Sequence, residues 1–194
     1  MTATRLGLLS YLFGMLFDIA AVRNVPRVKP FMLAAMAASQ LWAIYRLAAR
    51  SPRLPVPRAV RAVCAVLSPL ALLAMFYSIF VEIPLRKAWI EEGHMDELVT
   101  DGTYALSRHP GVLFYTVWIL AAALATRSRR LLTAAPTLIL GDVVHVAFQE
   151  RFVLEPYFGE AYREYQRTTP FLIPNRASAA RFLAGLRGRR PAEP

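Results

Sequence analysis

Long apolar blocks alternate with short links rich in proline and arginine along most of this chain. A helix that spans a bilayer needs about 20 mainly apolar residues, and five blocks approach or exceed that length. Helices do not run through clustered prolines, so the links separate the blocks into individual helices. The pattern predicts an all-α fold: a polytopic membrane bundle of about five transmembrane helices. The predicted spans are Leu6–Val22, Pro30–Ala49, Ala59–Ile83, Gly111–Thr126 and Leu131–Phe148.

Two polar segments remain outside these spans in the second half of the chain, residues 99–110 and residues 149–174. The link Arg127–Arg130 is so short that the last two spans should form an antiparallel hairpin. Both polar segments would then emerge at the same face of the membrane. Ionisable groups at the mouth of an apolar bundle are costly unless they are paired, which makes them candidates for function.

The net charge of +10 restricts the possible partners. The basic residues lie between and after the apolar blocks, which favours contact with anionic lipid headgroups over nucleic acid. Their distribution gives a weak preference for the polar segments and the C-terminus on the cytoplasmic side. Residues 176–190 alternate arginine with apolar residues, so this stretch is either an amphipathic helix on the headgroups or a disordered basic tail.

Three ionisable residues lie inside predicted spans: Asp18, Asp142 and His145. Asp142 and His145 are three residues apart and share a helix face. They could form a metal site or a proton relay, but a mutually satisfied polar pair inside the bundle is the favoured interpretation. The sequence contains no convincing set of metal ligands.

The polar segments carry two motifs in a fixed order. Asp101–Pro110 contains an Arg-His-Pro turn, the helical hairpin follows, and Gln149–Tyr165 and Thr169–Pro174 complete the pattern. This order resembles the isoprenylcysteine carboxyl methyltransferase family and the related phospholipid methyltransferases. The resemblance covers about Val99–Pro174, whereas the first three predicted spans match no motif. Positions that match the family pattern are Gly102, Tyr104, Arg108, His109, Pro110, Glu150, Phe158, Gly159, Tyr162 and Tyr165.

The resemblance implies a membrane methyltransferase that uses S-adenosylmethionine. The acceptor would be lipophilic or small, with a thiol, carboxylate or amine, and would reach the site from the membrane. The implied organisation is residues 1–83 as an N-terminal group of three spans, 84–174 as a catalytic region with the cofactor motifs, and 175–194 as a basic tail. The implied catalytic residues are Arg108, His109 and Glu150. The implied cofactor-binding residues are Gly102, Tyr104, His109, Pro110, Glu150, Phe158, Tyr162 and Tyr165.

The chemistry of the cofactor fits these side chains. S-adenosylmethionine carries a sulfonium, an amino group and a carboxylate, so its site needs an anion such as Glu150 and donors such as Arg108 or His109. Aromatic side chains could form a wall for the adenine. Methyl transfer is an in-line displacement that depends mainly on alignment and on the exclusion of water.

Four positions depart from the family pattern: Thr103, Val112, Phe114 and Gln149. The changes at Val112 and Phe114 could reshape an acceptor tunnel, and Gln149 could weaken a contact with the cofactor. Two alternatives therefore stand beside the methyltransferase. One is an NADPH-dependent membrane reductase of the sterol type, although such reductases have a glutamate in the stretch where this chain reads Val112–Tyr115. The other is a non-catalytic membrane scaffold.

Overall fold

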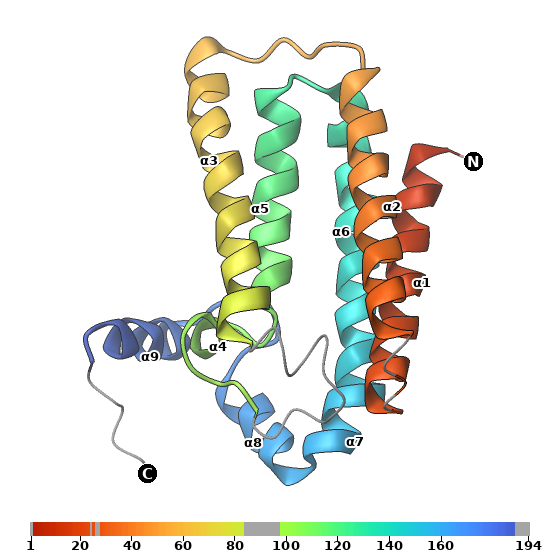
Figure 1. Ribbon diagram of the computed structural model, residues 1–194. Coiled ribbons are helices and arrows are strands. Elements are labelled where there is room, and N and C mark those ends of the chain that lie inside the picture. Colours follow the sequence, from red (N-terminus) through yellow and green to blue (C-terminus); the bar gives the residue numbers. More distant parts are fainter. Residues whose placement is uncertain (1, 24, 26–27, 84–97, 189–194) are drawn as a thin grey trace.

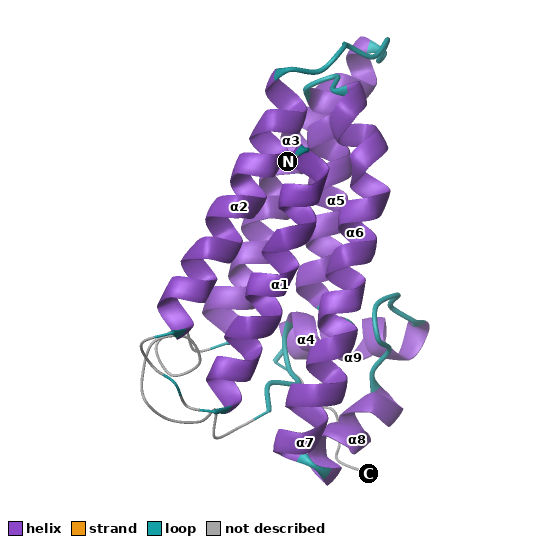
Figure 2. Cartoon of the chain, turned by 90° about the vertical axis from the view of Figure 1, so that its right-hand side faces the viewer, coloured by secondary structure: helices purple, strands orange, loops and turns teal. Residues whose placement is uncertain are grey.

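The protein is a bundle of long helices with a group of short helices at one end (Figure 1). The computed structural model describes residues 2–23, 25, 28–83 and 98–188, and this part of the chain forms helices and loops without a strand (Figure 2). Within these described ranges, four helices are long and apolar enough to cross a membrane, and α5, with 16 residues, is a shorter apolar helix. The predicted helical membrane bundle is confirmed. The long helices are α1 (Ala3–Val22), α2 (Lys29–Ala49), α3 (Arg58–Tyr77, extended by the π-helix η1, Ser78–Glu82), α5 (Pro110–Ala125) and α6 (Arg129–Gln149).

The ends of these helices follow from capping side chains and prolines. Thr2 caps α1 by accepting a hydrogen bond from the backbone of Arg5, and Ser128 caps α6 in the same way. These caps start α1 and α6 a few residues earlier than hydrophobicity alone predicts. Pro110 is the first residue of α5, a position where the missing N–H costs nothing.

Large apolar side chains cover the outside of the bundle. On α2 and α3 they include Trp42, Val63 and Leu73, each more than half exposed. The buried core lies between α2, α5 and α6, where Ile119 and Leu138 are fully buried. Apolar side chains on both the inside and the outside are what a bundle surrounded by lipid requires.

The helices α5 and α6 form an antiparallel hairpin whose turn lies beside the α2–α3 link. The backbone N–H of Leu54 donates to the carbonyl of Arg127 at 2.8 Å, and that of Arg129 donates to the carbonyl of Pro52 at 3.1 Å. The opposite end of the bundle carries α4 (Thr103–Leu106) together with the helices that follow α6 (Figure 1). The two polar segments therefore meet at one end of the bundle, although residues 84–97 lie outside the described part.

The last long helix does not stop at Phe148, as the hydrophobic pattern predicts. It continues through the π-helix η3 (Glu150–Leu154) and α7 (Glu155–Phe158), and it breaks only at Gly159, where φ is +58°. The wide turns of η3 end two residues before Pro156, which has no N–H to donate. After Gly159 the chain forms α8 (Glu160–Thr168) and then α9 (Arg176–Leu186).

Candidate functional site at one end of the bundle

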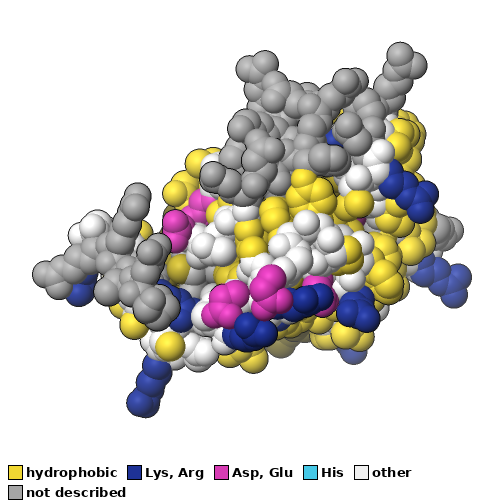
Figure 3. All heavy atoms as spheres, turned by 90° about the horizontal axis from the view of Figure 1, so that it is seen from below, with side chains coloured by type: hydrophobic (Ala, Val, Ile, Leu, Met, Phe, Trp, Pro, Cys, Tyr) yellow, Lys and Arg dark blue, Asp and Glu magenta, His cyan; other side chains and the backbone are white. Residues whose placement is uncertain are grey.

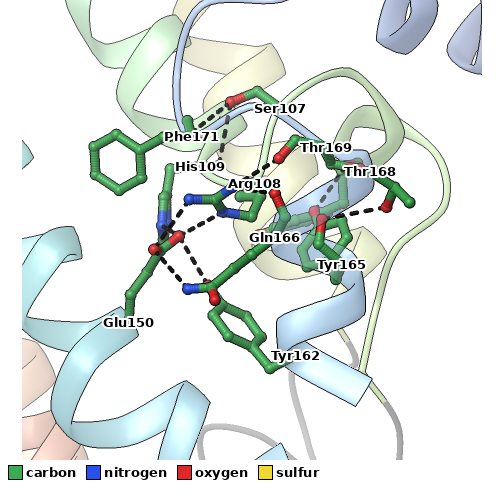
Figure 4. A network of polar contacts seen from close by, with 11 residues as sticks. Ser107, Arg108, His109, Glu150, Tyr162, Tyr165, Gln166, Thr168, Thr169 and Phe171 are labelled. Carbon is green, nitrogen blue, oxygen red and sulfur yellow. Dashed lines mark hydrogen bonds and ion pairs between the residues drawn. The ribbon is translucent and has the colours of Figure 1, made fainter. Parts of the chain in front are cut away.

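The carboxylate of Glu150 is the centre of a buried polar network (Figure 4). Glu150 is the first residue of η3, and only 9% of it is exposed. We call Glu150 and its four partners the Glu150 cluster. A carboxylate offers about four acceptor positions, so these contacts saturate it. The Oε1 atom contacts Arg108 Nε at 2.7 Å, His109 Nε2 at 2.8 Å and Tyr162 Oη at 2.9 Å, and Oε2 contacts Arg108 Nη2 at 3.1 Å and Gln166 Nε2 at 3.3 Å.

Arg108 is held in a single orientation by acceptors on both sides of its guanidinium. Two of its nitrogens form a fork on Glu150, and Nη1 donates to the carbonyls of Gln166 at 3.2 Å and Thr169 at 2.7 Å. The guanidinium carbon lies 5.6 Å from the centre of the Phe171 ring. The backbone N–H of Arg108 donates to the carbonyl of Pro170. A fork of this kind fixes geometry as well as charge, so the segment 169–171 and Arg108 hold each other in place.

Burial sets the protonation of the side chains around Glu150. The pKa of His109 is lowered, first by burial, while its hydrogen bond and charge interaction with Glu150 oppose the shift. Burial also raises the pKa of the Tyr162 and Tyr165 phenols, which therefore remain protonated. Tyr162 donates to Glu150, and Tyr165 donates to the carbonyl of Tyr104 at 2.7 Å. At neutral pH the cluster thus contains one anion, one cation and neutral donors.

Gly102 is required by the close approach of Glu82. Its φ is +59°, and a Cβ at this position would collide with Oε1 of Glu82. The Glu82 carboxylate accepts hydrogen bonds from the N–H of Thr103 at 2.8 Å and from its hydroxyl. The family pattern has proline in place of Thr103, and proline has neither an N–H nor a hydroxyl to donate to Glu82. Sequence reasoning missed Glu82, although a lone carboxylate at the end of an apolar block was the available signal.

The structure separates the predicted cofactor residues into groups. His109, Glu150 and Tyr162 lie in the cluster. Tyr104 and Tyr165 are joined beside it by their hydrogen bond. The remaining three act elsewhere: Gly102 against Glu82, Pro110 as the buried first residue of α5, and Phe158 on α7 with its ring edge-on to Tyr157.

A second buried carboxylate lies inside the bundle, on α1. Asp18 Oδ2 contacts His145 Nε2 at 2.9 Å, and Gln149 Nε2 donates to Asp18 Oδ1 at 3.1 Å. We call these three residues the Asp18 cluster. The favoured prediction of a mutual Asp142–His145 pair is wrong, because His145 hydrogen-bonds Asp18 across the helix interface. Gly14 leaves room for the histidine, since a Cβ there would lie 2.7 Å from His145 Cε1.

The Asp18 cluster also accounts for the departure at Gln149. An amide can donate to the Asp18 carboxylate, whereas the glutamate of the family pattern could do so only when protonated. Within the described residues no group of three or more His, Cys, Asp or Glu side chains is arranged to hold a metal ion.

The fold and these contacts define a helical membrane protein with a buried polar site at one end of its bundle. A family model described as phospholipid methyltransferase matches residues 62–163, which is more than half of the chain. The chain belongs to the phospholipid methyltransferase family. Since this match begins within α3, the third span belongs to the family region, and the interpretation that the first three spans carry no family signal was too narrow.

A curated relative supports the same assignment over a shorter stretch. Protein-S-isoprenylcysteine O-methyltransferase of Schizosaccharomyces pombe (strain 972 / ATCC 24843) is 32% identical over 82 residues, which cover 40% of this chain. The match spans 33% of that protein, or about a third of its length. No solved structure matches this chain.

Proposed function

We propose that this protein transfers a methyl group from S-adenosylmethionine to an acceptor in or at the membrane, and that the Glu150 cluster holds the cofactor. The observation that carries the proposal is the convergence of Arg108, His109 and Tyr162 on one buried carboxylate at the end of the bundle. The turn before α5, the π-helix η3 and α8 supply these donors and the carboxylate. Membership of a methyltransferase family supports the same conclusion.

The donors and acceptors of the cluster fit the charged end of the cofactor. Glu150 can accept from the cofactor's amino group, and Arg108 can donate to its carboxylate. In the structure these two side chains neutralise each other, so binding would exchange part of that ion pair for contacts with the cofactor. The half-buried ring of Phe171 offers aromatic surface beside the cluster, whereas the rings of Tyr162 and Tyr165 are buried behind it. When bound, S-adenosylmethionine supplies an electrophilic methyl group on its sulfonium.

The role of the protein in such a reaction is alignment. Arg108 is fixed by two backbone carbonyls as well as by Glu150, so it can hold a bound carboxylate in one position. His109 is neutral above its lowered pKa, so its ring can accept a proton from an acceptor that loses one. We therefore assign Arg108, His109 and Glu150 the catalytic roles, with a lipophilic or small thiol, carboxylate or amine as acceptor. We place this end of the bundle on the cytoplasmic side.

Calorimetry on the detergent-solubilised protein tests this proposal. S-adenosylhomocysteine should bind and NADPH should not, and Glu150→Ala should weaken binding of the former by at least about tenfold, because an ion pair and its hydrogen bonds are lost. Glu164→Ala removes the same charge from an exposed position on α8 and should leave binding unchanged. Binding of NADPH alone would favour the reductase, and binding of neither would favour the scaffold. Transfer of labelled methyl groups into membrane lipid extracts would then identify the acceptor class.

A further inference from the structure

Helix α9 lies crosswise to the long helices, beside the end of the bundle that carries the Glu150 cluster (Figure 1). It begins with a complete capping box in which Asn175 and Ser178 bond each other's backbone N–H. This local cap makes α9 a defined helix rather than a disordered tail over Arg176–Leu186. Its docked side includes buried Ser178, while Leu183 and Leu186 are exposed, the latter by 69%. Ile173, just before the helix, is 81% exposed.

The charge pattern of α9 differs from that of the neighbouring helix α8. On α8, Arg163 pairs with Glu160 at 3.2 Å and Arg167 pairs with Glu164 at 3.0 Å. Acidic and basic side chains accordingly lie interleaved on the lower face of the molecule (Figure 3). Residues 175–190 contain five arginines and no acidic residue. In the described part of α9 and its cap, the exposed Arg176 and Arg187 have no carboxylate partner among the described residues, so both are available to an external anion.

A third arginine connects α9 to the Glu150 cluster. Arg181 points inward, and its Nη2 donates to the carbonyl of Thr168 and, at 3.2 Å, to the hydroxyl of Thr169. The carbonyl of Thr169 accepts from Arg108 Nη1 at 2.7 Å. A single residue, Thr169, therefore links Arg181 of α9 to the guanidinium that holds Glu150, and a shift of α9 would move an acceptor of Arg108.

We propose that α9 is an interfacial anchor for a bilayer that contains anionic lipid, and that this lipid surface, by seating α9, sets the geometry of the Glu150 cluster. The regulatory half of this inference rests on the proposed function. Exposed leucines beside unpaired arginines are the combination that binds a helix in the plane of a charged membrane surface. The position of α9, next to the ends of the spans, brings it to the headgroup layer of the protein's own bilayer.

The full chain in nanodiscs tests the regulatory half. Nanodiscs of phosphatidylcholine alone are compared with nanodiscs that contain about 30% phosphatidylglycerol, a composition chosen to give an anionic surface. S-adenosylhomocysteine should bind at least about fivefold more tightly in the anionic discs, and added salt should reduce the gain. The double variant Arg176→Gln, Arg187→Gln should lose most of it. The matched double variant Arg163→Gln, Arg167→Gln should keep it, because those arginines already have partners.

A fluorescent probe on α9 tests the anchor separately. A Cβ at Gly185 meets nothing within 4 Å, so Gly185→Cys provides a labelling site for an environment-sensitive dye. The unsubstituted chain, whose Cys64 is buried, corrects for background labelling. The dye should report an apolar environment in the anionic discs, and Leu183→Gln with Leu186→Gln should reverse this. Arg181→Gln should leave the dye signal intact and abolish the lipid dependence of ligand affinity.

The outcomes separate this inference from the proposed function. Ligand binding of equal strength in both kinds of disc overturns the regulatory coupling while the methyltransferase proposal stands. A dye signal that is equally polar in both kinds of disc overturns the anchor. Absence of ligand binding in every disc counts against the cofactor site itself, and the dye measurement then still decides on the anchor.

Discussion

Two buried carboxylates, Asp18 and Glu150, lie near the end of α6, yet their surroundings differ. Gln149 donates to Asp18, and the next residue along the chain, Glu150, collects its donors from elsewhere. The Asp18 cluster joins two spanning helices, α1 and α6. The Glu150 cluster joins the end of α6 to the turn at Arg108 and to α8, which lie outside the spans. The donors around Glu150 can therefore rearrange for a ligand without displacing a membrane helix, whereas those around Asp18 cannot.

The two carboxylates also differ in the charge of their partners. Glu150 has a permanent cation in Arg108 and is saturated by hydrogen bonds, whereas Asp18 hydrogen-bonds only a histidine and an amide among the described residues. Glu150 also lies inside the region matched by the family, residues 62–163, and Asp18 lies before it. We infer that the Glu150 cluster is the ligand site and that the Asp18 cluster locks the helices together. Four predictions sharpen or break this distinction.

The largest effect is expected from Arg108→Gln. Arg108 and Glu150 are both about nine-tenths buried, and removal of one partner leaves an unpaired buried charge. Breaking such a pair costs about 3–5 kcal/mol of the free energy of unfolding, and binding of S-adenosylhomocysteine should fall at least about tenfold. Thermal unfolding and calorimetry in detergent measure both. As a control, Arg163→Gln breaks exposed ion pairs and should cost about 1 kcal/mol or less of the free energy of unfolding. Equal losses in the two variants would contradict the assignment of the Glu150 cluster as the ligand site.

The next largest effect is expected from Asp18→Asn. This change keeps the shape and removes the charge from two hydrogen bonds, so it should cost about 1.5–3 kcal/mol of the free energy of unfolding. The affinity for S-adenosylhomocysteine should stay within about twofold of the parent protein, because the Asp18 cluster lies outside the proposed ligand site. Asp142→Asn on α6, the helix that carries His145, is the control, since Asp142 forms no hydrogen bond with the described residues. If Asp18→Asn weakens ligand binding as strongly as Glu150→Ala, the two clusters act as a single site.

A smaller effect is expected from Tyr162→Phe. The variant removes one of five contacts from Glu150 and leaves the ion pair with Arg108 intact. The loss of one hydrogen bond to a charged group should cost about 1.5 kcal/mol or slightly more, visible as a fall in the unfolding temperature and in ligand affinity. Tyr165→Phe, which frees only the carbonyl of Tyr104, should reduce stability without a comparable fall in affinity. Similar affinity losses in both variants would mean that α8 as a whole, rather than the contact with Glu150, carries the effect.

The bundle and the centre of the site could be predicted from the sequence because they depend on local patterns. The length of apolar blocks determines the spans, and the Arg-His-Pro turn and Glu150 lie in motifs that a single chain displays. The short link between α5 and α6 was enough to bring these motifs to one end of the bundle. The division into residues 1–83, 84–174 and 175–194 stays a prediction.

The remaining features depend on contacts between positions far apart in the chain. Asp18 and Gln149 are separated by 131 positions, and no local pattern pairs them. The carbonyls of Gln166 and Thr169 that hold Arg108 belong to the backbone, so the identities of these residues do not predict the contacts. The continuation of the last helix to Phe158 was missed because hydrophobicity marks the end of a membrane span and not the end of a helix.

The smallest effect concerns pH and depends on His109 of the Glu150 cluster. Burial lowers the pKa of His109 below that of an unfolded histidine, so the unfolded chain binds more protons than the folded protein just below the usual value of about 6.5. The contribution of neutral His109 to stability is therefore present above about pH 6.5 and declines as the pH falls through that value. The difference in free energy of unfolding between the parent protein and His109→Asn should shrink between about pH 7.5 and pH 5.5. A difference that grows on acidification would show that Glu150 holds His109 in its charged form, and the cluster would then contain two cations around its carboxylate.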